Sequence, residues 1–266
     1  MGIKIETVKT RGVKMDYFRF GNGGKTFVML PGISIVSVMM SADLIAKQYE
    51  DLTSDFTFYV FDRASDIPSV YPVSAMAEDT LEAIKALGLS DIYCFGASQG
   101  GMIALTMAAM EPSLFAGLVA GSSCCSDSFC NDALREWVDL ARKGDAKALC
   151  QSFGQAVYPE SFYLENIKAF EGLALLATPG DLSRFAAIAS GTIGFDITGD
   201  LGKITCPVLA IGASDDRVLD PSGSSVIASK VPRGSLYMYD GFGHAAFDMA
   251  PDYRDRIRDF FLNCML

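Results

Sequence analysis

Short apolar runs, rich in β-branched and aromatic residues, recur along the chain. They lie at residues 4–9, 13–20, 26–30, 56–61, 92–96, 115–121, 206–212 and 235–239. A turn at Gly12 separates the first two runs, which predicts a β-hairpin. Most of the later runs are apolar without alternation, which is typical of strands buried on both faces of a parallel sheet.

Segments with helical periodicity alternate with these runs, at residues 41–50, 75–87, 99–110, 222–230 and 251–262. Ser74 stands directly before the second segment and is the expected N-cap there. Strands that alternate with helices of this length require right-handed crossovers. The sequence therefore predicts a doubly wound α/β fold with a mostly parallel sheet of about eight strands.

The alternation is interrupted once, between residues 122 and 201. Helical patterns follow one another there without an intervening strand, at residues 131–144, 146–157, 162–176 and 181–190. We expect an all-helical cap at residues 122–201, inserted into a core formed by residues 1–121 and 202–266. Doubly wound sheets bind ligands at the carboxyl ends of their strands, and such a cap would lie over that edge.

Charge and composition narrow the range of partners. The 266 residues include 32 acidic and 22 basic side chains, and the net charge of −10 would repel phosphate backbones and anionic lipid surfaces. We expect no nucleic-acid partner and no membrane association. The amino-terminal segment lacks the apolar stretch of a secretion signal, so we expect a cytoplasmic protein, as a monomer or homodimer. The single histidine and the absence of any CxxC spacing predict neither a metal site nor another cofactor.

The stretch YCFGASQGGMIA, residues 93–104, places Ser98 between Gly96 and Gly100 at a predicted junction of strand and helix. Small residues permit a sharp turn there, which lifts a serine hydroxyl clear of the sheet. A structural alternative is a glycine-rich turn that only packs the helix closely on the sheet. The catalytic interpretation requires a base, because a serine hydroxyl alone is a weak nucleophile.

His244, the single histidine of the chain, is the candidate base. It lies in YDGFGHAAFD, after the last predicted strand and before the last predicted helix. Two carboxylates, Asp215 and Asp216, follow the strand predicted at residues 206–212. A carboxylate beside the imidazole would fix its tautomer and stabilise the imidazolium that forms when it accepts the serine proton.

With FGASQGGMIA, IGASDDRVLD, DGFGHAAFD and LPGIS, the chain resembles the α/β-hydrolase fold superfamily over almost its whole length. The resemblance implies Ser98 as nucleophile, His244 as general base and acid, an aspartate as the orienting group, and a helical cap. Counting from the end of the preceding strand favours Asp215 as this aspartate. The local pattern of aspartate, any residue and two apolar residues favours Asp216, which we prefer, with Asp215 as the alternative.

The resemblance also implies an oxyanion hole made of the backbone N–H groups of Gln99 and Ile33. The second of these lies in LPGIS, where this sequence has Pro31 in place of the usual histidine of the family. Backbone donors do not depend on that side chain, so Ile33 remains the candidate.

These residues predict a serine hydrolase that acts through an acyl-enzyme on a small, largely apolar ester, or on a thioester or activated C–C bond. Ser98 argues against the dehalogenases and epoxide hydrolases of this fold, which use an aspartate nucleophile. Two alternatives stay open: a binding protein for a small ligand without catalysis, and an aminopeptidase-type hydrolase that uses cap carboxylates at Glu160, Glu165 or Glu171. The candidate pocket residues are Ile33, Met39, Met40, Met102, Tyr158, Phe162 and Phe185.

Overall fold

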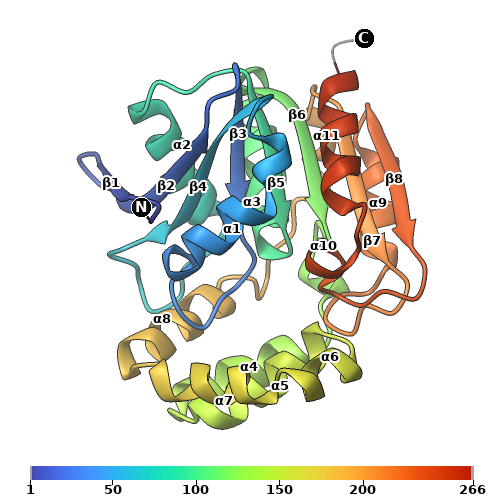
Figure 1. The fold of residues 1–266 in the computed structure, drawn as a ribbon. Helices are drawn as coiled ribbons and strands as arrows, with labels where there is room; N and C mark the ends of the chain where they lie inside the picture. The colour runs from blue at the N-terminus through green and yellow to red at the C-terminus, as the bar shows by residue number, and fades with distance from the viewer. Residues whose placement is uncertain (1, 265–266) are drawn as a thin grey trace.

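Eight strands form one sheet in the computed structural model, which describes residues 2–264 (Figure 1). Their order is β1-β2-β4-β3-β5-β6-β7-β8, with β2 antiparallel to both of its neighbours and all other pairs parallel. The predicted mostly parallel, doubly wound sheet is therefore confirmed. The strands are β1 (Ile5–Lys9), β2 (Lys14–Gly21), β3 (Lys25–Leu30), β4 (Phe56–Ala64), β5 (Ile92–Ala97), β6 (Phe115–Gly121), β7 (Val208–Ala213) and β8 (Gly234–Tyr239).

Helices cover both faces of the sheet. On one face lie α2 (Val73–Ala86), α3 (Gln99–Met110) and α9 (Ser222–Lys230); on the other lie α1 (Ala42–Gln48) and α11 (Tyr253–Asn263) (Figure 1). Successive residues of a strand point to opposite faces, so β3 sends Val28 and Leu30 into one apolar cluster and Phe27 and Met29 into the other. Both faces are buried, which explains the uninterrupted apolar runs of the sequence.

The start of α2 differs from the expectation. The helix begins at Val73 after Pro72, so Ser74 lies inside its first turn and is not the N-cap. The carbonyl of Gly191 accepts the Val73 N–H, at 3.3 Å, and takes the place of a capping side chain. Because Gly191 is remote in sequence, local spacing gave no sign of this contact.

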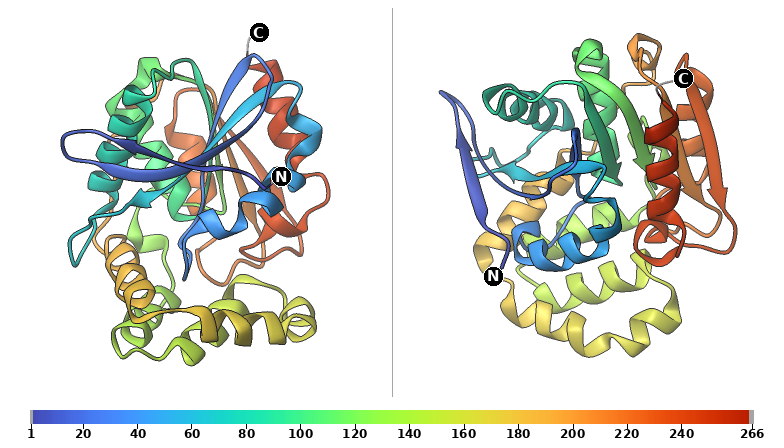
Figure 2. Two further views of the ribbon diagram at one scale, coloured as in Figure 1. Left: turned by 60° about the vertical axis from the view of Figure 1, so that its left-hand side comes forward. Right: turned by 45° about the horizontal axis from the view of Figure 1, so that its top comes forward.

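Residues 122–201 contain five helices, which lie together at the carboxyl ends of the strands (Figure 1 and Figure 2). The helix expected at residues 162–176 is two helices, because the backbone leaves helical geometry at Asn166. The Asn166 side-chain amide donates to the Phe162 carbonyl, at 2.9 Å, and competes with the regular backbone pattern. The five helices are α4 (Ala133–Arg142), α5 (Ala146–Val157), α6 (Glu160–Glu165), α7 (Ile167–Leu176) and α8 (Pro179–Ser190).

The strand order reverses between β3 and β5. The chain leaves β3 for β4 on one side and later returns to β5 on the other, so the loops after β3 and β5 diverge from one point. Leu30 pairs with Gly96 at this point, which brings LPGIS beside the turn that carries Ser98. Open α/β sheets bind ligands in the crevice at such a switch point. None of the helices in the described part of the chain has the length and apolar character needed to cross a bilayer.

Candidate active site

Ser98 occupies a sharp turn between β5 and α3. Its φ of 53° and ψ of −122° are unfavourable for a residue with a side chain, and its N–H is held by the Gly121 carbonyl at 2.8 Å. The flanking glycines are required by space: a Cβ on Gly100 would lie 2.0 Å from the Leu30 carbonyl oxygen, and a Cβ on Gly96 would lie 2.3 Å from the Gly100 oxygen. The glycines therefore pack the helix closely on the sheet, and the same turn presents the serine at the carboxyl edge.

His244 contacts Asp216 and not Asp215. Its Nδ1 lies 2.8 Å from Asp216 Oδ2, and the two side chains are only 4% and 3% exposed. The other Asp216 oxygen accepts the backbone N–H groups of Val218 and Leu219, at 2.8 and 2.9 Å. Three partners thus fix the carboxylate of Asp216. In the described part of the chain, the exposed Asp215 carboxylate accepts a hydrogen bond only from the neighbouring Ser214 hydroxyl.

Ser98 and His244 line the same cavity, which has a volume of about 590 Å³. With Nδ1 engaged by Asp216, the nitrogen of His244 that is left to exchange a proton is Nε2. The cavity lies at the switch point, since the loop after β3 and the turn after β5 both form its wall. Its lining is mostly apolar, and helices α4 to α7 contribute Leu134, Trp137, Phe153, Phe162 and Leu173.

Gln99 and Ile33, the predicted oxyanion donors, also line this cavity. Within residues 2–264, neither backbone N–H has a hydrogen-bond acceptor. Gln99 is the first residue of α3, where an N–H has no partner inside the helix. The loop carrying Ile33 passes close to the serine, because a Cβ on Gly32 would lie 3.2 Å from the Ser98 Cβ.

Four of the seven predicted pocket residues line the cavity: Ile33, Met102, Tyr158 and Phe162. The structure places Met39, Met40 and Phe185 elsewhere, which corrects the sequence prediction for these three. Met39 packs against the apolar cluster of the sheet, and Met40 is 67% exposed. Phe185 is buried within the helices against Phe153, with 6.4 Å between the ring centroids. Helical spacing alone does not show which apolar residues reach the cavity.

Charged residues are scarce around the cavity. Asp248 is the only carboxylate in its described lining, and no Lys or Arg of residues 2–264 lines it. The glutamates Glu160, Glu165 and Glu171 are exposed and do not line it. Tyr158 donates its hydroxyl to Asp248 Oδ2 at 3.2 Å; burial and this carboxylate raise the pKa of the Tyr158 phenol, which stays protonated at neutral pH.

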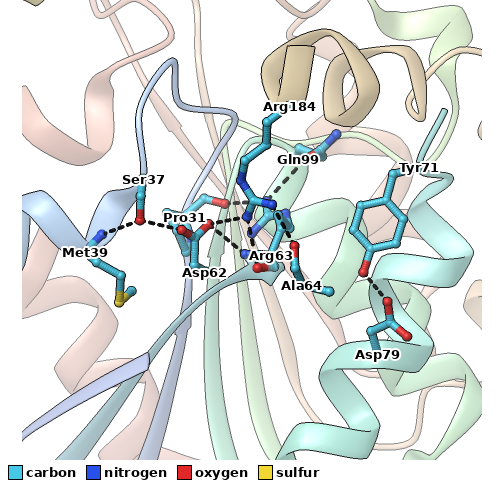
Figure 3. Close-up of polar contacts among 10 residues, drawn as sticks. All are labelled: Pro31, Ser37, Met39, Asp62, Arg63, Ala64, Tyr71, Asp79, Gln99 and Arg184. Carbon is cyan, nitrogen blue, oxygen red and sulfur yellow. Dashed lines mark hydrogen bonds and ion pairs between the residues drawn. The ribbon is translucent and has the colours of Figure 1, made fainter. Parts of the chain in front are cut away.

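The sequence pattern did not point to two residues at or near the cavity, Asp248 and Arg63. Asp248 lies only four residues after His244, on the short helix α10 (Ala246–Met249). No sequence motif marked it as a site residue. Arg63 lies next to the end of strand β4 and contacts both the loop after β3 and the first turn of α3 (Figure 3). Arg63 could have been identified from the sequence, because a charged pair directly after FTFYVF is unusual in a buried strand. Within residues 2–264, no group of three His, Cys, Asp or Glu side chains is arranged to hold a metal ion.

Comparison with known proteins agrees with this architecture. A family model described as alpha/beta hydrolase fold matches residues 25–149, which include β3, β5 and the Ser98 turn. The chain is 27% identical over 229 residues to the "Putative carbamate hydrolase RutD" of Agrobacterium fabrum, covering 81% of this chain and 86% of that protein.

Two solved structures extend the similarity to almost the whole chain. The alpha/beta hydrolase enzyme MGS-M2 from a Medee basin deep-sea metagenome library superposes with a TM-score of 0.87 at 21% identity, covering 97% of this chain and 98% of that one. The enol-lactonase from Burkholderia xenovorans LB400 superposes with a TM-score of 0.82 at 14% identity, covering 97% and 100%. At these identities the likeness establishes a shared fold.

Proposed function

We propose that this chain is a serine hydrolase that acts through an acyl-enzyme intermediate, because an alpha/beta hydrolase fold model matches residues 25–149 and solved hydrolases share its fold. The observation that carries the proposal is the meeting of Ser98 and His244 in one cavity, with His244 held by Asp216. A buried imidazole whose Nδ1 is fixed by a carboxylate presents Nε2 as a base. The strained turn at Ser98 supports the same role, since such strain is concentrated at functional sites.

The proposed reaction has two stages. Ser98 Oγ attacks the carbonyl carbon while His244 Nε2 takes its proton, and the same proton then passes to the leaving group. In the second stage, water gives a proton to His244 and attacks the acyl carbon. The bond from that carbon to Ser98 Oγ then breaks, the proton passes to Oγ, and the acid is released. The N–H groups of Gln99 and Ile33 would stabilise the negative oxygen in both stages, because neither is used elsewhere within residues 2–264.

We further propose that residues 122–201 act as a cap and that the substrate is a neutral, largely apolar ester. Side chains from α4 to α7 form part of the cavity wall, as a cap requires. A cavity of about 590 Å³ suits a ligand much larger than acetate. With Asp248 in its lining and no Lys or Arg there within residues 2–264, it is better matched to a neutral acyl group than to an anion.

Carbamate hydrolysis is the second candidate, because RutD relatives carry that name. A free carbamate anion is small and negative, and both properties fit this cavity less well than an apolar ester does. Phenol release from aryl esters and ammonia release from free carbamate, each measured above its spontaneous rate, separate the two functions directly. We expect a higher kcat/KM for the esters; a higher value for the carbamate would favour the second candidate.

Labelling with a fluorophosphonate probe tests the serine hydrolase itself. The wild-type protein should become labelled, and the label should be lost in Ser98→Ala and strongly reduced in His244→Ala. Ser41→Ala is the matched control, because Ser41 also lines the cavity but has no proposed role. No labelling of folded wild-type protein, together with retained binding of an apolar dye, would instead favour a ligand-binding protein without catalysis.

A further inference from the structure

Arg63 is a buried cation behind the proposed oxyanion hole. Its side chain comes from the end of β4 and is only 5% exposed. One nitrogen, Nη2, donates to two acceptors: the carbonyl oxygen of Pro31 at 2.8 Å and Oε1 of Gln99 at 3.2 Å (Figure 3). A single guanidinium thus joins the loop after β3 to the first turn of α3.

Arg63 does not form an ion pair with the adjacent carboxylate. The two Asp62 oxygens accept instead from the Ser37 hydroxyl, at 2.5 Å, from the Arg184 guanidinium, at 3.1 Å, and from the Arg63 backbone N–H, at 2.7 Å (Figure 3). The Arg63 Nε has no acceptor within residues 2–264. Burial lowers the pKa of Arg63 to about 10, partly offset by Asp62, so the side chain is still charged at neutral pH.

A buried charge with neutral partners destabilises a fold, and an apolar side chain would be the more stable choice. The buried Arg63 guanidinium does, however, hydrogen-bond to two particular segments. Pro31 lies two residues before Ile33 and Gln99 directly follows Ser98, so each segment carries one proposed oxyanion donor. We propose that Arg63 is a positioning residue that holds these two backbone donors at a fixed separation, an inference that rests on the proposed serine hydrolase.

Gln99 completes the arrangement through its side chain. Its Nε2 donates to the Ile188 carbonyl and to Thr192 Oγ1, both at 2.9 Å, while Oε1 accepts from Arg63. The side chain is fully buried, and both ends of its amide are engaged. Arg63 therefore holds a group that is itself fixed to α8 and to the segment that follows it.

The side chain and the backbone of Gln99 can be tested separately. Gln99→Met removes both ends of the amide but keeps the backbone N–H proposed as an oxyanion donor. Arg63→Met removes the guanidinium at similar length, and Arg63→Lys restores the charge without the planar fork. Circular dichroism and Tm establish that each variant is folded before its kinetics are compared.

The readout is kcat and KM for an aryl ester, with the affinity for an aryl trifluoromethyl ketone. Ser98 Oγ adds to the ketone carbon, its proton passes to His244, and the ketone oxygen becomes the oxyanion. We expect kcat and ketone affinity to fall on the order of 10²-fold in Arg63→Met and Gln99→Met, with KM within about threefold. Arg63→Lys should recover part of the loss. A purely structural role would lower Tm without this division between kcat and KM.

Arg184→Met is the matched control. Arg184 donates to the carbonyls of Arg63 and Ala64 and to Asp62, but it donates no hydrogen bond to Pro31 or Gln99. The Arg184→Met variant should have a lower Tm than the wild type but a ketone affinity near the wild-type value. Wild-type ketone affinity and kcat in folded Gln99→Met, and in whichever Arg63 variant folds, would overturn the inference while fluorophosphonate labelling upheld the proposed function. An unlabelled wild-type protein would overturn both.

Discussion

Two neighbouring aspartates show how position decides the role of a residue. Asp216 is buried and contacts His244, and its second oxygen is held by the N–H groups of Val218 and Leu219. Asp215, one residue earlier, is exposed, and within residues 2–264 its carboxylate accepts a hydrogen bond only from the neighbouring Ser214 hydroxyl. The carboxylate that faces the imidazole is therefore fixed by the turn that follows it, and the local Asp-x-apolar-apolar pattern reflects that turn.

Replacing each aspartate by asparagine separates the two roles. In Asp216→Asn the amide oxygen can still accept the two turn N–H groups, but the amide nitrogen would donate to His244 Nδ1. The imidazole proton would then stay on Nε2, which could no longer accept one from Ser98. We expect this variant to lower kcat for an aryl ester by about 10³- to 10⁴-fold. Asp215→Asn should keep kcat within about threefold of the wild-type value. Equal losses in the two variants would contradict the assignment of Asp216 as the partner of His244.

At the scale of elements, the junction of β5 and α3 is tightly constrained by close backbone packing. The first turn of α3 approaches the end of β3 so closely that Gly100 lies against the Leu30 carbonyl. That approach also places the loop with Ile33 over Ser98. The close packing of α3 against β3 therefore also sets the geometry of the proposed site.

Alanine at two helical glycines tests this constraint. Gly100→Ala would put a methyl group 2.0 Å from the Leu30 oxygen, so we expect a loss of about 3 kcal/mol in the free energy of unfolding. Gly172 in α7 has open space at its Cβ position and no positive φ. Gly172→Ala should therefore stabilise the protein by up to about 1 kcal/mol through higher helix propensity. Urea unfolding measures both, and similar values would contradict the close approach.

The elements themselves were largely predictable because buried parallel strands leave continuous apolar runs. Each of the eight predicted strands exists, with bounds shifted by at most about three residues. The failures involve contacts that local sequence does not encode. The start of α2 depends on the remote Gly191 carbonyl, and the break at Asn166 depends on whether a side-chain amide turns back on its own helix.

At the scale of the molecule, the candidate site is assembled from segments spread over more than half of the chain. Ser98, Asp216 and His244 were predictable because each follows a strand, and parallel strands end at the same edge. The cavity wall was less predictable, because it depends on how α4 to α7 pack. Met40 and Phe185 were chosen for their type, yet one faces solvent and the other faces its own helices.

The proposed role of residues 122–201 as a cap leads to a prediction about substrate length. If these helices enclose the acyl group, each added methylene should raise kcat/KM by about fourfold, from about 0.8 kcal/mol of burial, until the cavity is filled. Leu173 of α7 lines the cavity, whereas Leu175 on the same helix is 89% exposed. A series of aryl esters with increasing acyl length measures where the rise stops.

Leu173→Trp should reduce the free volume and move the optimum to shorter acyl chains. Leu175→Trp adds the same bulk to the same helix outside the cavity, so its profile should match the wild type. The comparison is informative because both variants change α7 equally in composition and differ only in the direction that the side chain faces. Coinciding profiles for the two variants would show that α7 does not enclose the acyl group, and the cap would then need another role.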